Sequence, residues 1–212
     1  MLQEVDVAKS YSMNNKLQHV IEATRLASIS DKRKEELEVL IRYVKKRYEA
    51  ESAIHLNFIC THNSRRSQFA QVWAKVAADY YGLDINSYSG GVEVTACNSL
   101  TVDSLERFGF EISQEGSVNT VYKLIFDAKK APILLSSKLY DDDKNPSSEF
   151  AAVMTCSHAD ENCPVVLGCE ERISLRYDDP KLYDNTPLES TFYDYRSFQI
   201  ASEMMYVFSK VK

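Results

Sequence analysis

One stretch limits what this chain of 212 residues can fold into: an apolar run that stops at a cysteine, followed shortly by an arginine and a serine. Ile54 to Ile59 is short and apolar enough to be a buried strand, and Gln68 to Ala78 has apolar residues at helical spacing. A loop that joins a strand to a helix directs unpaired N–H groups and the positive end of the helix dipole at one point. The sequence therefore predicts a strand, an anion-binding loop and a helix.

The predicted loop contains residues suited to nucleophilic chemistry on a phosphate-like anion, and these are Thr61, His62, Asn63, Ser64, Arg65, Arg66 and Ser67. Arg66 can hold the anion with a bidentate fork, and Ser67 can donate a hydrogen bond to a Cys60 thiolate. Asn63 can stabilise the loop conformation. Because the N–H groups, the dipole and Arg66 favour the thiolate, Cys60 is the candidate nucleophile. A buried cysteine that merely ends a core strand is the alternative, and the arginine and serine at this spacing disfavour it.

The composition excludes several classes of protein. The sequence is 44% hydrophobic and 26% charged, as in an ordinary globular protein, and no apolar run has membrane-spanning length. Early acidic residues argue against a secretory signal, and five scattered cysteines argue against a secreted disulfide framework, so a cytoplasmic location is expected. A net charge of -6 gives no reason to expect nucleic acid as a partner. The oligomeric state is left open.

Residues 1–52 are predicted to form a helical N-terminal extension, and residues 53–212 the catalytic domain. One helix covers Asn14 to Ala27, and the next begins near Ser30 or Asp31, either of which can cap it. The second helix has an apolar stripe at helical spacing, made of Leu37, Leu40, Ile41 and Val44. The extension either packs on the same chain, the favoured interpretation, or forms a dimerisation or partner surface.

Strands and helices are predicted to follow one another after the loop. Ile85 to Glu93 is a strand that includes the glycine pair Gly90-Gly91, which is typical of a tight turn. Asn98 to Phe110 is a helix closed by Gly109. Two β-rich runs, 121–126 and 132–136, favour a β-hairpin insertion around residues 118–140.

A second apolar run, Phe150 to Thr155, also ends at a cysteine, Cys156, and Cys163 follows seven residues later. The end of such a strand is where an α/β sheet presents its active site. A zinc site is not predicted, because C-x6-C is not a standard ligand spacing. The acidic run 141–143 lacks the alternating spacing of a calcium loop, so no metal or other cofactor is expected. Two unrelated loop cysteines are the alternative, which the presence of Cys60 disfavours.

The spacing Cys60-x5-Arg66-Ser67 resembles the low-molecular-weight protein tyrosine phosphatase superfamily, which includes the thioredoxin-coupled arsenate reductases. The seven-residue separation of Cys156 and Cys163, with a proline after the second, resembles the redox segment of those reductases. The resemblance implies an α/β three-layer sandwich with a central, mainly parallel four-stranded sheet, here with the N-terminal helical extension added. It also implies an acid in a late Asp-Pro, which is Asp179 here, after a strand at 172–175 and before a final helix that starts near residue 186.

The resemblance to the reductases implies a relay of thiols with a redox-active disulfide. Cys60 attacks arsenate held by the loop and Arg66, and Asp179 protonates the leaving oxygen. Cys156 then forms a disulfide with Cys60 and releases arsenite. Cys163 takes over the disulfide, and thioredoxin reduces it.

Two other functions are compatible with the sequence. A phosphatase of this superfamily would use only Cys60, Arg66 and Asp179, through a cysteinyl-phosphate, on phosphotyrosine or a small phosphate. A non-enzymatic protein that binds a partner is disfavoured because all three residues are present. Gln71 stands where potassium-binding reductases usually have glutamate, so a cation site is not predicted.

Overall fold

The computed structural model describes residues 13–162 and 165–212, in which two sheets are present. The first has four strands, each parallel to its neighbours, in the order β2 (Asn86–Gly91), β1 (His55–Cys60), β6 (Phe150–Met154) and β7 (Cys169–Ser174). The second is antiparallel, in the order β3 (Glu111–Glu115), β4 (Val121–Ile125) and β5 (Ile133–Leu135). The predicted fold class, a central four-stranded parallel sheet flanked by helices, is confirmed.

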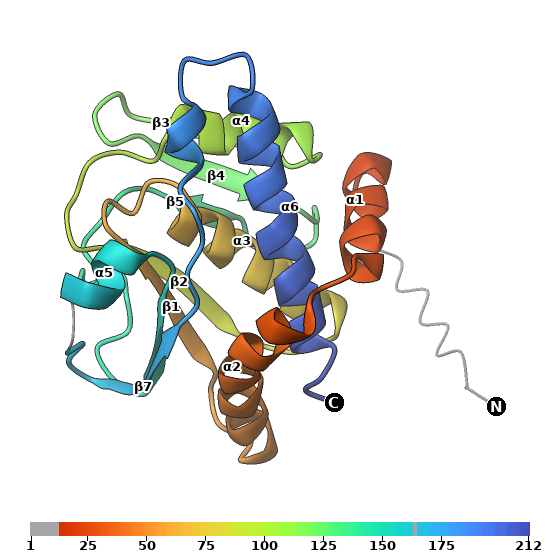
Figure 1. Cartoon of the computed structure of the whole chain (residues 1–212), viewed down its shortest axis with the longest axis vertical. Helices are drawn as coiled ribbons and strands as arrows, with labels where there is room; N and C mark the ends of the chain where they lie inside the picture. Colours follow the sequence, from red (N-terminus) through yellow and green to blue (C-terminus); the bar gives the residue numbers. More distant parts are fainter. Residues whose placement is uncertain (1–12, 163–164) are drawn as a thin grey trace.

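Helices pack around one long C-terminal helix. They are α1 (Asn15–Leu26), α2 (Asp31–Glu49), α3 (Arg66–Tyr80), α4 (Ser99–Arg107), α5 (Ser157–Asn162), the 3-10 turn η1 (Pro180–Tyr183) and α6 (Glu189–Phe208). Five of them, α1 to α4 and η1, contact α6, which runs through the middle of the view in Figure 1. Among the helices of the described ranges, none has both the length and the apolar character needed to cross a membrane.

The two central strands of the parallel sheet, β1 and β6, are buried on both faces, which explains their nearly continuous apolar runs. On β1, Leu56 and Phe58 belong to the large core that also contains Trp73 of α3. Ile59, which points to the opposite face, belongs to a smaller cluster with Met154 of β6. Because β1 is paired on both sides, the loop that follows Cys60 starts from a rigid support.

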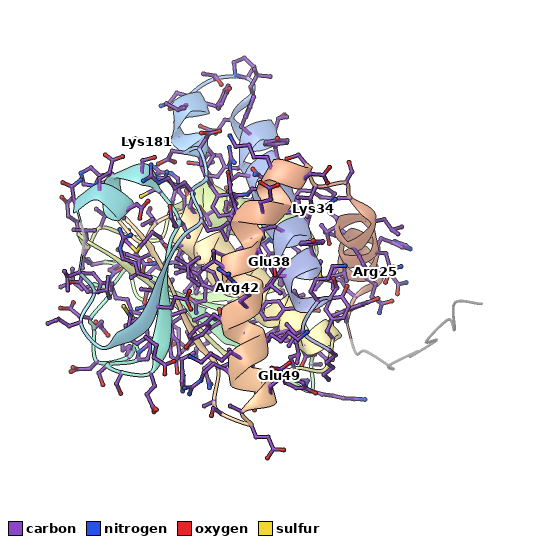
Figure 2. All side chains as sticks on the ribbon, turned by 60° about the horizontal axis from the view of Figure 1, so that its bottom comes forward. Arg25, Lys34, Glu38, Arg42, Glu49 and Lys181 are labelled. Atoms are coloured by element: carbon purple, nitrogen blue, oxygen red, sulfur yellow. The ribbon has the colours of Figure 1, made fainter. Side chains whose placement is uncertain are left out.

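The N-terminal extension packs on the same chain, as the favoured interpretation predicts. Asn14 caps α1 by accepting a hydrogen bond from the N–H of Leu17 (2.9 Å), and Ser30 caps α2 by accepting one from Arg33 (3.3 Å). The predicted apolar stripe of α2 is buried, and α2 contacts both α6 and β7. Figure 2 looks onto α2, along whose length the charged residues Lys34, Glu38, Arg42 and Glu49 lie.

The second sheet contains one strand that the sequence did not indicate. The two predicted β-rich runs form the antiparallel pair β4 and β5, but β3 adds a third strand, from Glu111 opposite Ile125 to Glu115 opposite Val121. Most of β3 is exposed, and its sequence EISQE has a single apolar residue, so it lacks the alternation by which a strand is recognised. Whether this sheet is an insertion into the family's fold stays a prediction.

Candidate active site

The loop after β1 is shaped by contacts to its carbonyl groups. The carbonyl oxygen of His62 accepts a hydrogen bond from Ser137 Oγ (2.8 Å), and that of Asn63 accepts one from Gln68 Nε2 (2.8 Å). Asn63 itself has the left-handed backbone angle φ 46°, which asparagine tolerates better than most residues. None of these contacts uses the N–H groups of the loop. N–H groups at such a place, before the start of α3, are suited to bind an oxyanion.

The predicted glycine pair lies directly against this loop. A Cβ atom on Gly91 would be 2.7 Å from the backbone nitrogen of Asn63 and 2.9 Å from the carbonyl carbon of His62. A Cβ atom on Gly90 would be 2.3 Å from Tyr140 Cα. Both neighbours are backbone atoms that cannot rotate away, so these positions require glycine for close approach of the chain.

Cys60 is buried at the end of β1, and its thiol has a defined hydrogen-bond partner. Its Sγ is 3.0 Å from Ser67 Oγ. Asn63 Nδ2 donates to the same Ser67 oxygen at 2.9 Å, which leaves the hydroxyl proton of Ser67 free to point at sulfur. The structure thus brings together the candidate nucleophile, the serine and the asparagine that the sequence singled out.

Arg66 begins α3, and its guanidinium joins the loop to the segment before η1. Nη2 donates to Asp179 Oδ2 at 2.6 Å, and Nη1 donates to the carbonyl oxygen of Tyr177 at 3.1 Å. Nε is buried without a hydrogen-bond partner among the described residues. A buried donor of this kind costs free energy unless a ligand accepts from it. An oxyanion that accepts from Nε and Nη2 would compete with Asp179 for the second of these donors.

Arg65, although in the predicted loop, is directed toward α6. Its Nε donates to Tyr193 Oη at 2.8 Å, and Nη2 lies 3.6 Å from Asp184 Oδ2. Tyr193 Oη in turn donates to Asp184 Oδ1 at 2.9 Å. Burial raises the pKa of Tyr193 above its usual value, so its hydroxyl remains a donor. No sequence pattern indicates a role for Tyr193 at the site, because a tyrosine on a helix is most often a core residue.

Cys156 lies at the same edge of the sheet as Cys60, because β6 and β1 are parallel neighbours. Its buried Sγ is 3.5 Å from Thr61 Oγ1 and accepts a hydrogen bond from the N–H of Ala159 at 3.4 Å. Thr61 Oγ1 is also 3.3 Å from Nδ1 of His158. The anion loop therefore contacts both the second thiol and the first turn of α5.

The remaining cysteines have different positions. Cys163 lies outside the described residues. Cys169 pairs in register with Phe150 at the start of β6, six residues before Cys156, which places it about 20 Å away along the strand. At that separation Cys169 is not placed to exchange with Cys156. Cys97 is buried, and burial raises its pKa to about 12, so it stays a neutral thiol.

Metal binding finds no support in the described part of the chain. Across residues 13–162 and 165–212, no three His, Cys, Asp or Glu side chains are grouped so that they could hold a metal ion. Gln71, at the position considered for a cation ligand, accepts a hydrogen bond from Ser89 Oγ at 2.6 Å and donates to the carbonyl oxygen of Leu134 at 3.3 Å. Both ends of the Gln71 amide therefore have protein partners.

Comparison with known proteins finds arsenate reductases among the relatives of this chain. An arsenate reductase from Halalkalibacterium halodurans is 30% identical over 132 residues, which are 62% of this chain and 78% of that protein. Arsenate reductases from Brevibacillus brevis and Staphylococcus aureus are each 32% identical, over 58% of this chain and 74% and 76% of their own lengths. No family model matches the chain.

Two solved structures match weakly, at low sequence identity. A low molecular weight phosphotyrosine phosphatase from Vibrio cholerae O395 has a TM-score of 0.49 and 13% identity, and the match covers 73% of this chain and 94% of that one. An arsenate reductase in the phosphate binding state has a TM-score of 0.47 and 17% identity, over 76% and 100% of the two chains.

Proposed function

Because this chain belongs to the low-molecular-weight protein tyrosine phosphatase superfamily, which includes the arsenate reductases, we propose that it reduces arsenate to arsenite with Cys60, Cys156 and Cys163. The chain is an enzyme of the reductase or phosphatase kind. The observation that favours the reductase is the position of Cys156, whose buried sulfur lies 3.5 Å from Thr61 Oγ1 of the anion loop. A phosphatase needs no second thiol at that place.

The first step is attack on arsenic by the Cys60 thiolate, which Ser67 stabilises through the 3.0 Å contact between Oγ and Sγ. The loop N–H groups and Arg66 bind the remaining arsenate oxygens. A sulfur–arsenic bond forms, an arsenic–oxygen bond breaks, and Asp179 in its protonated form gives its proton so that the oxygen leaves as water. Without an anion Asp179 accepts from Arg66 Nη2 at 2.6 Å, and arsenate that takes over this donor would leave the carboxyl group of Asp179 free to carry the proton.

The second step transfers two electrons to arsenic. The Cys156 thiolate attacks Cys60 Sγ, a disulfide forms, and the sulfur–arsenic bond breaks with its electron pair passing to arsenic, which leaves as arsenite. Cys163 then attacks Cys156, and Cys60 departs as a thiolate. A dithiol protein reductant, for which thioredoxin is the candidate, reduces the Cys156–Cys163 disulfide. This chemistry suits the cytoplasm, where such reductants act, and it requires neither nucleic acid nor a membrane.

The second candidate function is hydrolysis of phosphomonoesters through a cysteinyl-phosphate. The contact between Cys60 and Ser67 and the pair formed by Arg66 and Asp179 favour it, because these groups suffice for attack on phosphorus and protonation of a leaving alcohol. In this reaction Cys156 and Cys163 have no role.

The experiment that separates the two functions measures arsenate turnover with thioredoxin, thioredoxin reductase and NADPH beside hydrolysis of p-nitrophenyl phosphate. The variants are Cys156→Ser and Cys163→Ser, with Cys97→Ser as the matched control. The reductase predicts that the first two variants lose arsenate turnover and retain any phosphatase activity, whereas the control keeps both. A wild type that turns over no arsenate, together with relay variants that hydrolyse phosphate normally, would establish the phosphatase instead.

A further inference from the structure

An arginine of the N-terminal extension reaches the segment that presents the candidate acid. Arg33, in the first turn of α2, donates from Nε to Glu203 Oε1 at 3.0 Å and from Nη2 to Glu203 Oε2 at 2.9 Å. Its guanidinium carbon also lies 4.8 Å from the ring centroid of Tyr177. The side chain of Glu203 on α6 is only 3% exposed. Arg33 therefore fills the space between α2, α6 and the Tyr177 ring with a paired charge.

Tyr177 is the residue through which this contact reaches the site. Its ring is buried under Arg33, its N–H donates to the carbonyl oxygen of Thr155 at 3.1 Å, and its own carbonyl accepts from Arg66 Nη1 at 3.1 Å. Asp179 follows two residues later and accepts from Nη2 of the same arginine. One short segment thus fixes the direction of the Arg66 guanidinium and the position of the candidate acid.

We propose that Arg33 is a positioning residue for Arg66 and Asp179, so that the N-terminal extension forms part of the catalytic unit. Arg33 clamps the Tyr177 ring against Glu203, which holds the backbone on which the Tyr177 carbonyl and the Asp179 side chain are presented. The proposal rests on the proposed function, in which Arg66 binds an oxyanion and Asp179 protonates the leaving oxygen. It goes beyond that function by assigning a task to residues 13–52.

The planar fork of Arg33 is essential to this contact. A guanidinium can bind both carboxylate oxygens of Glu203 and lie flat on the Tyr177 ring at the same time, whereas the compact ammonium of lysine cannot do both. Arg33→Lys therefore keeps the charge beside Glu203 but loosens Tyr177. Since Asp179 protonates the leaving oxygen, the loss of kcat/KM in Arg33→Lys should be larger for leaving groups that depend more on protonation.

The test compares Arg33→Lys with Arg25→Lys, a matched control on α1 whose arginine forms an ion pair with Glu22 of its own helix. The kcat/KM values for phenyl phosphate and p-nitrophenyl phosphate are measured, because phenolate needs protonation and p-nitrophenolate needs little. Arsenate turnover is measured alongside. Hydrogen exchange at the Tyr177 amide is followed in the same proteins, since it reports the bond to Thr155 whether or not turnover occurs.

For Arg33→Lys we expect kcat/KM for phenyl phosphate to fall by about tenfold or more, and kcat/KM for p-nitrophenyl phosphate to change by less than about threefold. Hydrogen exchange at the Tyr177 amide should accelerate. Arg25→Lys should match the wild type. Glu203→Gln weakens the same bidentate contact from the side of α6, so it should also lower kcat/KM for phenyl phosphate and accelerate exchange at Tyr177. Equal losses with both esters, or unchanged exchange at Tyr177, would overturn the positioning role. If the wild type turns over neither arsenate nor esters, the proposed function fails, and the exchange rates alone decide whether Arg33 holds Tyr177.

Discussion

Substitution of Gly91 by alanine tests whether the anion loop must keep its observed shape. The added Cβ would lie 2.7 Å from the backbone nitrogen of Asn63, where ordinary contact begins at 3.4 Å. The loop must therefore retreat by about 0.7 Å, because the contacted atom belongs to the backbone and has no rotamer to change. Such a shift moves the loop N–H groups away from the oxyanion that they are proposed to bind.

A displacement of about 1 Å at a catalytic group can cost about 100-fold in rate, so a shift of this size should lower kcat/KM by roughly 10- to 100-fold. The assay is hydrolysis of p-nitrophenyl phosphate and reduction of arsenate, with inhibition by inorganic phosphate as an independent measure of anion binding. Phosphate should inhibit Gly91→Ala more weakly than wild type, since the same N–H groups bind it.

The control is Gly116→Ala, at a glycine with φ +83° and no atom within 4 Å of the added Cβ. That substitution strains the backbone by about 1 kcal/mol but leaves the anion loop alone, so it should lower stability without changing kcat/KM. A folded Gly91→Ala variant with wild-type kcat/KM and wild-type phosphate inhibition would refute the argument that the loop and Gly91 are in forced contact.

Three further predictions concern groups away from the reacting atoms. Ser197→Ala removes the 2.9 Å acceptor of the buried indole N–H of Trp73 and should lower the free energy of unfolding by about 1–3 kcal/mol in urea denaturation; a change within error would mean that another acceptor takes over. Burial lowers the pKa of Lys138 to about 8 from its usual 10.5, so the unfolded chain binds the proton more tightly. Lys138→Met should therefore be more stable than wild type at pH 7, with an advantage that shrinks between pH 8 and 10.5, and an advantage constant across that range in thermal unfolding would contradict the assignment. Cys97→Ala should keep turnover within about twofold, because the pKa of about 12 leaves Cys97 an inert thiol, and a tenfold loss would show that it takes part.

The parts of the site that could be predicted are those encoded by neighbouring residues. The strand that leads to Cys60 and the helix predicted from Gln68 follow from hydrophobic spacing over a few residues. Ser30 and Asp31 were the two candidate caps before a helical stripe, and the structure uses Ser30. The cap forms because a serine hydroxyl can accept from the helix's own first N–H groups. Interactions of this kind, between residues close in the sequence, can be predicted without knowing the fold.

Contacts between distant segments could not be predicted. Arg66 and Asp179 lie 113 residues apart, and nothing near either residue indicates that the arginine would bind the acid rather than only an anion. Arg65 was predicted as part of the anion-binding loop, and nothing in the sequence indicated that its side chain would also donate to Tyr193 on α6. Both outcomes depend on where α6 and η1 pack against the loop, which is decided by the whole core.

The parallel pairing of β1 with β6 has a consequence for how the oxidised enzyme would unfold. A disulfide between Cys60 and Cys156 closes a loop of about 97 residues, nearly half the chain, and such a loop lowers the entropy of the unfolded state by an amount worth about 4.7 kcal/mol. A disulfide between Cys156 and Cys163 closes only 8 residues and restrains the unfolded chain far less. In the proposed relay, the Cys60–Cys156 disulfide would therefore stabilise the fold against unfolding, and its exchange for Cys156–Cys163 would remove most of this stabilisation. The intermediate that has just released arsenite should resist denaturant most strongly.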